Sequence, residues 1–176
     1  MIKNQAIRIL ITGPESTGKS VICKLLSQHF KGAIVEEYAR DYIAGLNRPY
    51  LEEDLLHIAQ KQMHLEDEIK KAPLVFFDTD MTVIHIWSEE KFRHTHDWIL
   101  QEMHQRTYDL YLLMDVDIPW QEDEQRENPL DRDRLLKLYQ KSFEERNISY
   151  HLISGQTNTR LKNAIKIVED FLNGIR

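Results

Sequence analysis

Short apolar runs alternate along the chain with longer segments in which apolar residues recur every three or four positions. The short runs are rich in β-branched or aromatic residues, and polar residues or glycine follow each of them, a pattern typical of strands. The predicted strands cover residues 6–12, 33–36, 74–78, 110–114 and 149–154. The run Leu74-Val-Phe-Phe is apolar at every position, which indicates a strand buried on both faces, as in a parallel sheet.

Helical patterns fill the segments between the predicted strands. The last is the most regular, because its apolar residues stand four, three and four positions apart and so form one stripe. That stripe consists of Leu161, Ile165, Val168 and Leu172. A second long helix is predicted over 51–72, where Pro73 stops it. The alternation of strands and helices predicts a parallel sheet covered by helices on both faces.

The composition is that of an ordered globular protein. The 176 residues are 41% hydrophobic and 30% charged, which excludes disordered and low-complexity classes. A chain of this length forms one domain with a full core. Cys23 is the one cysteine in the sequence, so no internal disulfide can form. We therefore predict a single domain over residues 1–176.

The charge balance bears on possible partners. The 29 acidic residues exceed the 23 lysines and arginines, which gives a formal net charge of −6, and a nucleic-acid partner would require a coherent basic surface. Every apolar run is shorter than the roughly 18 residues that span a bilayer. The N-terminal run 6–12 contains Arg8, which does not fit a secretion signal. The sequence predicts a cytoplasmic protein that binds neither nucleic acid nor membrane, and it leaves the oligomeric state open.

A phosphate-binding motif follows the first predicted strand. It has the pattern G-x-x-x-x-G-K-[ST] and is followed by a helical pattern from Val21 onward. The motif consists of Gly13, Pro14, Glu15, Ser16, Thr17, Gly18, Lys19 and Ser20. Glycines let the backbone curl so that its N–H groups point at phosphate oxygens, and the next helix presents its positive dipole end to the same anion.

The motif predicts nucleotide binding by residues 13–21, with ATP and Mg²⁺ as cofactors. Lys19 is expected to bridge the β- and γ-phosphates, and the Ser20 hydroxyl to ligate Mg²⁺. The motif does not determine whether the γ-phosphoryl group passes to water or to an acceptor.

Two carboxylates, Asp78 and Asp80, end the third predicted strand. In an extended strand, residues two apart face the same side, so both side chains would point into one crevice. A magnesium ion or a proton relieves the repulsion between close carboxylates. We predict that Asp78 serves a metal and that Asp80 orients a reacting hydroxyl. The alternative, strongest for Asp80, is a cap on the helix expected from Met81.

A second charged cluster, Glu36-Glu37-Tyr38-Ala-Arg40, follows the second predicted strand. We predict that Glu36, Glu37, Tyr38 and Arg40 bind the substrate. A carboxylate here can orient or deprotonate an acceptor hydroxyl, and Arg40, one helical turn away, can hold an anionic group. The alternative is that these acids complement the dipole at the start of a helix.

An acidic segment with several arginines follows the fourth predicted strand, and we predict a lid at about 118–134. A flap with arginines can close over phosphates, expel water and stabilise transferred charge. Arg126 is the candidate catalytic arginine, and Arg132 is a second. The alternative is a solvated loop followed by ion pairs on a helix face, which applies above all to Arg132 and Arg134.

These motifs, taken in order, resemble the ribosylnicotinamide kinase domain of NadR-type bacterial proteins and the related stand-alone P-loop ATPases. The resemblance covers nearly the whole chain. Its motifs are the 13–20 loop, Glu37-Tyr38-x-Arg40, Asp78-Thr79-Asp80, Asp115-x-Asp117-x-Pro119-Trp120, and Gly155 followed by Arg160. The Glu-Tyr-x-Arg and Asp-Thr-Asp motifs in this order are much more specific than the glycine loop.

The resemblance implies a P-loop kinase sheet with strand order 2-3-1-4-5, Mg-ATP as donor, and an acceptor near Glu37 and Asp80. It also implies a lid over 119–132 and places the loop around Gly155 near adenine. The chain has no adenylyltransferase or DNA-binding domain, so at most the kinase function is expected. In this family an aromatic residue that stacks on the pyridine ring often precedes the glutamate; here Glu36 takes that position.

We therefore expect an α/β P-loop NTPase fold: three α/β/α layers, a five-stranded parallel sheet and a lid. The expected activity is that of an ATP-dependent small-molecule kinase acting on a ribosyl hydroxyl. The acceptor would be a riboside or nucleoside, with nicotinamide riboside as the leading candidate. The competing hypothesis is an ATP-binding regulator that hydrolyses ATP slowly and reports its nucleotide state to a protein partner.

Overall fold

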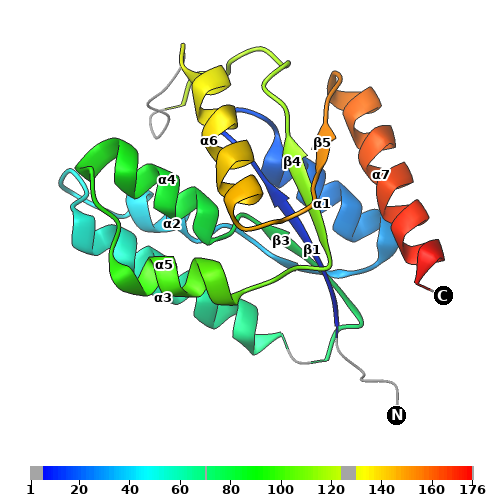
Figure 1. The fold of residues 1–176 in the computed structure, drawn as a ribbon, viewed down its shortest axis with the longest axis horizontal. Helices are drawn as coiled ribbons and strands as arrows, with labels where there is room; N and C mark the ends of the chain where they lie inside the picture. The colour runs from blue at the N-terminus through cyan, green and yellow to red at the C-terminus, as the bar shows by residue number, and fades with distance from the viewer. Residues whose placement is uncertain (1–5, 70, 124–129, 176) are drawn as a thin grey trace.

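The computed structural model describes residues 6–69, 71–123 and 130–175 (Figure 1). At its centre is one five-stranded sheet in the order β2-β3-β1-β4-β5, and each pair of neighbours is parallel. The strands are β1 (Ile7–Thr12), β2 (Ala33–Val35), β3 (Leu74–Asp78), β4 (Leu110–Met114) and β5 (His151–Ile153). The five-stranded parallel sheet and the strand order implied by the family resemblance are both confirmed.

Helices cover both faces of the sheet, which confirms the predicted three layers. Figure 1 shows α1 and α7 together on one side, and α3 to α6 on the other. The helices are α1 (Lys19–Phe30), α2 (Ala39–Ala44), α3 (Glu52–Glu68), α4 (Met81–Phe92), α5 (Asp97–Gln105), α6 (Arg132–Glu145) and α7 (Thr157–Gly174). Within these described ranges, none of the helices combines the length and apolar character needed to cross a membrane.

The alternation of side chains along the buried strands separates the core into two faces. Ile9 and Ile11 of β1 pack in the cluster that includes Val168 of α7, whereas Leu10 packs in the cluster that includes Phe143 of α6. Successive residues of a strand point to opposite faces, so an apolar residue at every position is what a sheet covered on both sides requires.

The helix predicted over 51–72 is shorter than expected and ends at Glu68. Ile69 leaves the helical conformation with φ −82° and ψ 89°. A residue before proline is disfavoured in helical geometry, so Ala72 cannot readily extend the helix toward Pro73. The chain must also turn back here to begin β3.

Because the five strands are parallel, their carboxyl ends lie along one edge of the sheet. The segments that leave this edge are 13–18, 36–38, 79–80, 115–117 and 154–156. Together with the residues directly beside them, they contain most of the site residues predicted from the sequence, and ligands of open α/β sheets bind outside this edge.

Candidate active site

The loop between β1 and α1 has a backbone that its glycines make possible. Gly13 has φ 139°, and a Cβ atom there would lie 2.9 Å from the Met114 carbonyl oxygen. Gly18, just before α1, has φ 80°, and Ser16 has φ 56°. Left-handed residues interspersed in a loop make successive N–H groups converge on a concave site suited to an anion. The observed backbone is therefore that of a phosphate cradle.

Lys19 begins α1, and its side chain folds back over this loop. Its Nζ donates to the Pro14 carbonyl at 2.9 Å, and the Thr17 hydroxyl donates to the same oxygen at 2.7 Å. The ammonium thus lies against the cradle, next to the positive end of the α1 dipole. The cradle and Lys19 together form a concentrated positive site for phosphate.

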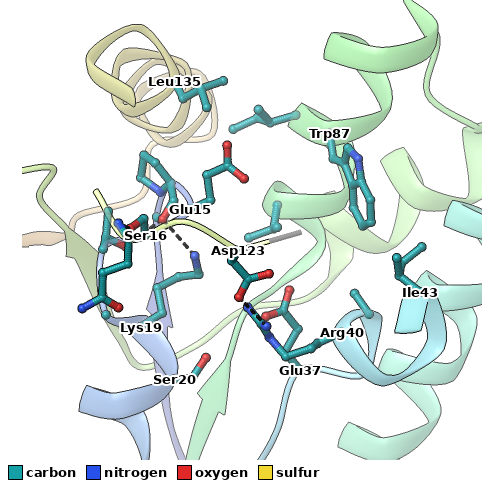
Figure 2. Close-up of a pocket in the computed structure, with 18 of the residues that line it drawn as sticks. Glu15, Ser16, Lys19, Ser20, Glu37, Arg40, Ile43, Trp87, Asp123 and Leu135 are labelled. Carbon is teal, nitrogen blue, oxygen red and sulfur yellow. Dashed lines mark hydrogen bonds and ion pairs between the residues drawn. The ribbon is translucent and has the colours of Figure 1, made fainter. Parts of the chain in front are cut away.

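The cradle opens into a cavity of about 750 Å³ whose opposite wall is largely apolar. That wall comes from α2, α4 and α6, and includes Ile43, Val83, Ile86, Trp87, Leu135 and Tyr139. Figure 2 shows Lys19 and Ser20 at one end, Trp87 and Ile43 at the other, and Glu37 and Arg40 between them. One cavity therefore joins the glycine loop with Lys19 to a largely apolar wall.

Asp78, at the end of β3, is 2% exposed and close enough to Ser20 for that hydroxyl to lower the carboxyl pKa. Among the described residues, no group donates a hydrogen bond to its Oδ1. A buried carboxylate oxygen without a partner and an adjacent hydroxyl are hard oxygen ligands, which fit Mg²⁺. The described residues contain no cluster of three or more His, Cys, Asp or Glu able to hold a metal, but Mg²⁺ typically completes its shell with water and substrate phosphates.

Burial, and then the nearby negative charge of Glu37, raise the pKa of Asp78 to about 6. The Asp78 carboxyl therefore holds its proton more tightly in the folded protein than in the unfolded chain. Ionisation of Asp78 lowers the free energy of unfolding. This loss is absent well below pH 4 and reaches its full value above about pH 7.

Asp78→Asn is accordingly expected to raise the free energy of unfolding of metal-free protein. The gain should be about 3 kcal/mol at pH 8, narrowing to about 1 kcal/mol at pH 4.5. Urea unfolding at both pH values in the presence of a chelator measures it. A gain that does not change with pH would contradict the role assigned to the buried charge.

The chain does not stay extended between Asp78 and Asp80, contrary to the condition assumed in the sequence analysis. Thr79 has φ 87°, a strained conformation for a β-branched residue. Asp80 is 3% exposed, and its two oxygens accept hydrogen bonds from Thr12 at 3.0 Å and Thr82 at 2.5 Å. It precedes α4, but its side chain makes no capping hydrogen bond. The Asp80 carboxylate instead ties the end of β1 to the first turn of α4.

Of the cluster after β2, Glu37 and Arg40 line the cavity, and Glu36 and Tyr38 are not among the lining residues. The Glu36 side chain is 69% exposed and its carboxylate lies 3.8 Å from Lys24. The Tyr38 ring packs against Tyr42 on α2, with 5.9 Å between ring centroids. Because successive side chains of an extended segment point in opposite directions, Glu37 faces inward and Glu36 outward. Glu36 and Tyr38 were predicted to bind the substrate, but the structure places neither of them among the residues that line the cavity.

The segment after β4 lies over the cradle. The Gln121 amide donates to the Ser16 hydroxyl at 2.9 Å, and Arg132 donates to the carbonyls of Ser16 and Ile118 at 3.0 and 2.9 Å. Arg126, the predicted catalytic arginine, lies outside the described residues. Arg134 forms ion pairs with Glu90 and Asp131, as the ion-pair alternative for this region predicted.

Sequence reasoning missed two contacts that shape the cavity. The Trp87 indole N–H donates to the Tyr50 hydroxyl at 2.9 Å, and the two rings lie edge to face with centroids 5.1 Å apart. Asp123, in the segment over the cradle, pairs with Arg40 at 2.8 Å. Sequence periodicity does not relate Tyr50, in the loop before α3, to Trp87 of α4, nor Asp123 to Arg40. The sequence indicated these contacts only by the aromatic or charged character of the residues.

Gly155, predicted to lie near adenine, is in the loop between β5 and α7. It has φ 98°, and a Cβ atom there would come within 2.9 Å of Thr159 Cγ2. Its amide donates to Asp117 at 2.6 Å. The residues that line the cavity include Arg160 of α7 but not Gly155.

Comparison with curated proteins finds relatives over nearly the whole chain. The trifunctional NAD biosynthesis/regulator protein NadR of Salmonella typhimurium (strain LT2) is 24% identical over 174 aligned positions, and the match covers 93% of this chain and 42% of that protein. NadR of Escherichia coli (strain K12) matches with the same identity and coverage. The chain thus spans less than half the length of these relatives.

Solved structures share the fold. A crystal structure of NadR protein in complex with NR has a TM-score of 0.76 at 18% identity, covering 94% of this chain and 50% of that one. Thymidylate kinase from Ehrlichia chaffeensis has a TM-score of 0.68 at 14% identity, covering 93% and 98%. These likenesses confirm the P-loop kinase fold predicted from the motifs.

A family match completes these findings. The AAA domain family AAA_28 matches residues 8–160, a range that includes the cradle, Asp78, Asp80, the segment over the cradle and Arg160. The range covers most of the chain, and the chain therefore belongs to the AAA_28 family of AAA domains.

Proposed function

We propose that this chain is an ATP-dependent, Mg²⁺-requiring kinase that phosphorylates a hydroxyl of a small riboside or nucleoside. The observation that carries the proposal is that the cradle with Lys19 and the aromatic pocket at Tyr50 and Trp87 belong to one cavity. A hydrolase or switch needs the cradle alone, whereas a kinase must also hold an organic acceptor beside the phosphates.

The residues of the site have different roles in an in-line transfer of the phosphoryl group. The amides of 13–18 and Lys19 hold the phosphates and balance the charge that develops on them. Glu37, which lines the cavity between the cradle and the aromatic end, orients the acceptor hydroxyl and accepts its proton. Ser20 and Asp78 are the residues that would hold Mg²⁺, which when bound neutralises phosphate charge. We further propose that 118–134 is the lid of this single domain, and that the loop at Gly155 lies near adenine.

The apolar end of the cavity supports a flat aromatic group as part of the acceptor. Trp87 and Tyr50 offer ring surfaces there, beside aliphatic side chains of α2 and α4. Relatives point to the same chemical class, since NadR has been crystallised with NR and another structural neighbour is a deoxyadenosine kinase from M. mycoides. Nicotinamide riboside is the leading acceptor.

A screen of ribosides and nucleosides for acceptor-dependent ADP release tests this proposal. Nicotinamide riboside is expected to raise ADP release at least about tenfold above the rate without acceptor. Nicotinamide mononucleotide, whose ribose is already phosphorylated, is the matched control and should have no such effect. Normal ATP binding without stimulation by any riboside or nucleoside would overturn the kinase assignment. Stimulation by another protein alone would favour the regulatory switch.

A further inference from the structure

Arg160, in the first turns of α7, is a buried cation with an unusual set of partners. It is 1% exposed, and its Nε donates to the Gly155 carbonyl at 2.9 Å. Its Nη1 donates to the carbonyls of Thr17 at 3.0 Å and Asp115 at 3.1 Å, and its Nη2 pairs with the Asp117 carboxylate. Four of its five N–H donors are therefore occupied by protein.

These partners come from three separate loops at the carboxyl edge of the sheet: the cradle, the segment after β4 and the segment after β5. Burying a guanidinium is costly unless its donors are satisfied. A planar fork can satisfy acceptors in several directions at once, which a lysine ammonium on its flexible stem cannot do as rigidly. The position of Arg160 thus links the three loops.

The contact with Thr17 has a direct consequence for the cradle. A trans peptide is planar, with its C=O and following N–H antiparallel, and the described chain contains no cis peptide. Holding the Thr17 carbonyl therefore directs the Gly18 N–H away from Arg160. Arg132 holds the preceding carbonyl, that of Ser16, in the same manner at 3.0 Å. Two consecutive peptide planes of the cradle are oriented by arginines distant in sequence.

We infer that Arg160 is a positioning residue that holds the cradle in its phosphate-binding conformation and couples it to the loop at Gly155. It acts through the backbone, because four of its five N–H donors are occupied by protein oxygens. An orientation set in advance lowers the cost of binding an anion, since the loop need not be ordered by the ligand. This inference rests on the proposed binding of a nucleotide by the cradle.

Calorimetric titration with Mg-ATP and with inorganic tripolyphosphate tests the inference. Arg160→Met should weaken both at least about tenfold, because the cradle loses its support whichever ligand enters, and Arg160→Lys should recover part of the loss. Arg106→Met is the matched control: this arginine also pairs with carboxylates, Asp67 and Glu102, but at the opposite edge of the sheet. It should bind both ligands as the wild type does.

Backbone NMR signals distinguish a change in the conformation of the cradle from a general loss of stability. The six glycines give separate backbone signals in protein labelled with ¹⁵N-glycine. In ligand-free Arg160→Lys, the signals of Gly18 and Gly155 should shift, while those of Gly32 and Gly45 stay in place.

Unchanged affinities together with an unchanged Gly18 signal would overturn the inference. If Arg160→Met does not fold, Arg160→Lys decides the question by the same two measurements. If wild-type protein binds no ATP, the proposed function fails, and the Gly18 signal still decides whether Arg160 sets the loop.

Discussion

Replacing Lys19 with alanine is expected to lower acceptor-dependent ATP turnover by about 10³-fold. Lys19 Nζ now donates to the neutral Pro14 carbonyl. A phosphate oxygen is a stronger acceptor than this carbonyl, because its negative charge adds Coulomb attraction to the hydrogen bond from the ammonium. The ammonium is therefore positioned to move from the carbonyl to the transferred group, where negative charge develops.

ADP release with saturating ATP and acceptor measures this loss. Lys24→Ala is the matched control, since Lys24 is a lysine of the same helix whose side chain is largely exposed and lies near Glu36. Lys24→Ala should retain wild-type turnover. Substantial residual turnover in Lys19→Ala, within about tenfold of wild type, would mean that Lys19 does not serve the transferred phosphoryl group.

Glu37→Gln is expected to reduce kcat by about 10²-fold, while the dissociation constant of ATP stays within about threefold. Glu37 lines the cavity between the cradle and the aromatic pocket, so its carboxylate can reach a hydroxyl presented to the phosphates. An amide keeps the size of the side chain but cannot accept the proton. The loss should therefore appear in transfer and not in nucleotide binding.

Glu36→Gln makes this test specific. The two glutamates are neighbours in sequence, but Glu36 is largely exposed and paired loosely with Lys24, so the same substitution there should leave both kcat and ATP binding unchanged. Equal losses from the two substitutions would indicate a general effect of charge on this edge of the sheet. Loss of ATP binding in Glu37→Gln would place Glu37 with the nucleotide.

Much of the architecture could be predicted because its determinants are local. The buried strands contain apolar residues at consecutive positions, and α7 repeats its apolar residues at helical spacing. The cradle is local as well, because Gly13 and Gly18 permit left-handed backbone wherever they stand in a fold. The position of Asp78 could be predicted for the same reason, since it ends a strand at the edge where parallel sheets place their sites.

Which side chains of a short segment face the cavity was harder to predict. Glu36 and Glu37 were both expected at the site, but an extended chain can present only one of two neighbours to the cavity. Which of them it is depends on how β2 pairs with β3, through Val35 and Phe77. Similarly, the left-handed turn at Thr79 occurs where its amide donates to the Ile11 carbonyl of β1, a partner that no local pattern reveals.

By itself, the sequence determined the fold class, the strand order through its family resemblance, and the phosphate cradle, because periodicity and glycine positions act over a few residues. Only the tertiary structure decided which side chains share the cavity. Trp87 donates a hydrogen bond to Tyr50, and Asp123 forms an ion pair with Arg40. Arg160 donates a hydrogen bond to Thr17, 143 positions away in the sequence. Such pairs form because parallel strands bring the ends of distant segments to one edge of the sheet, and a buried charge or indole N–H must find its partner there.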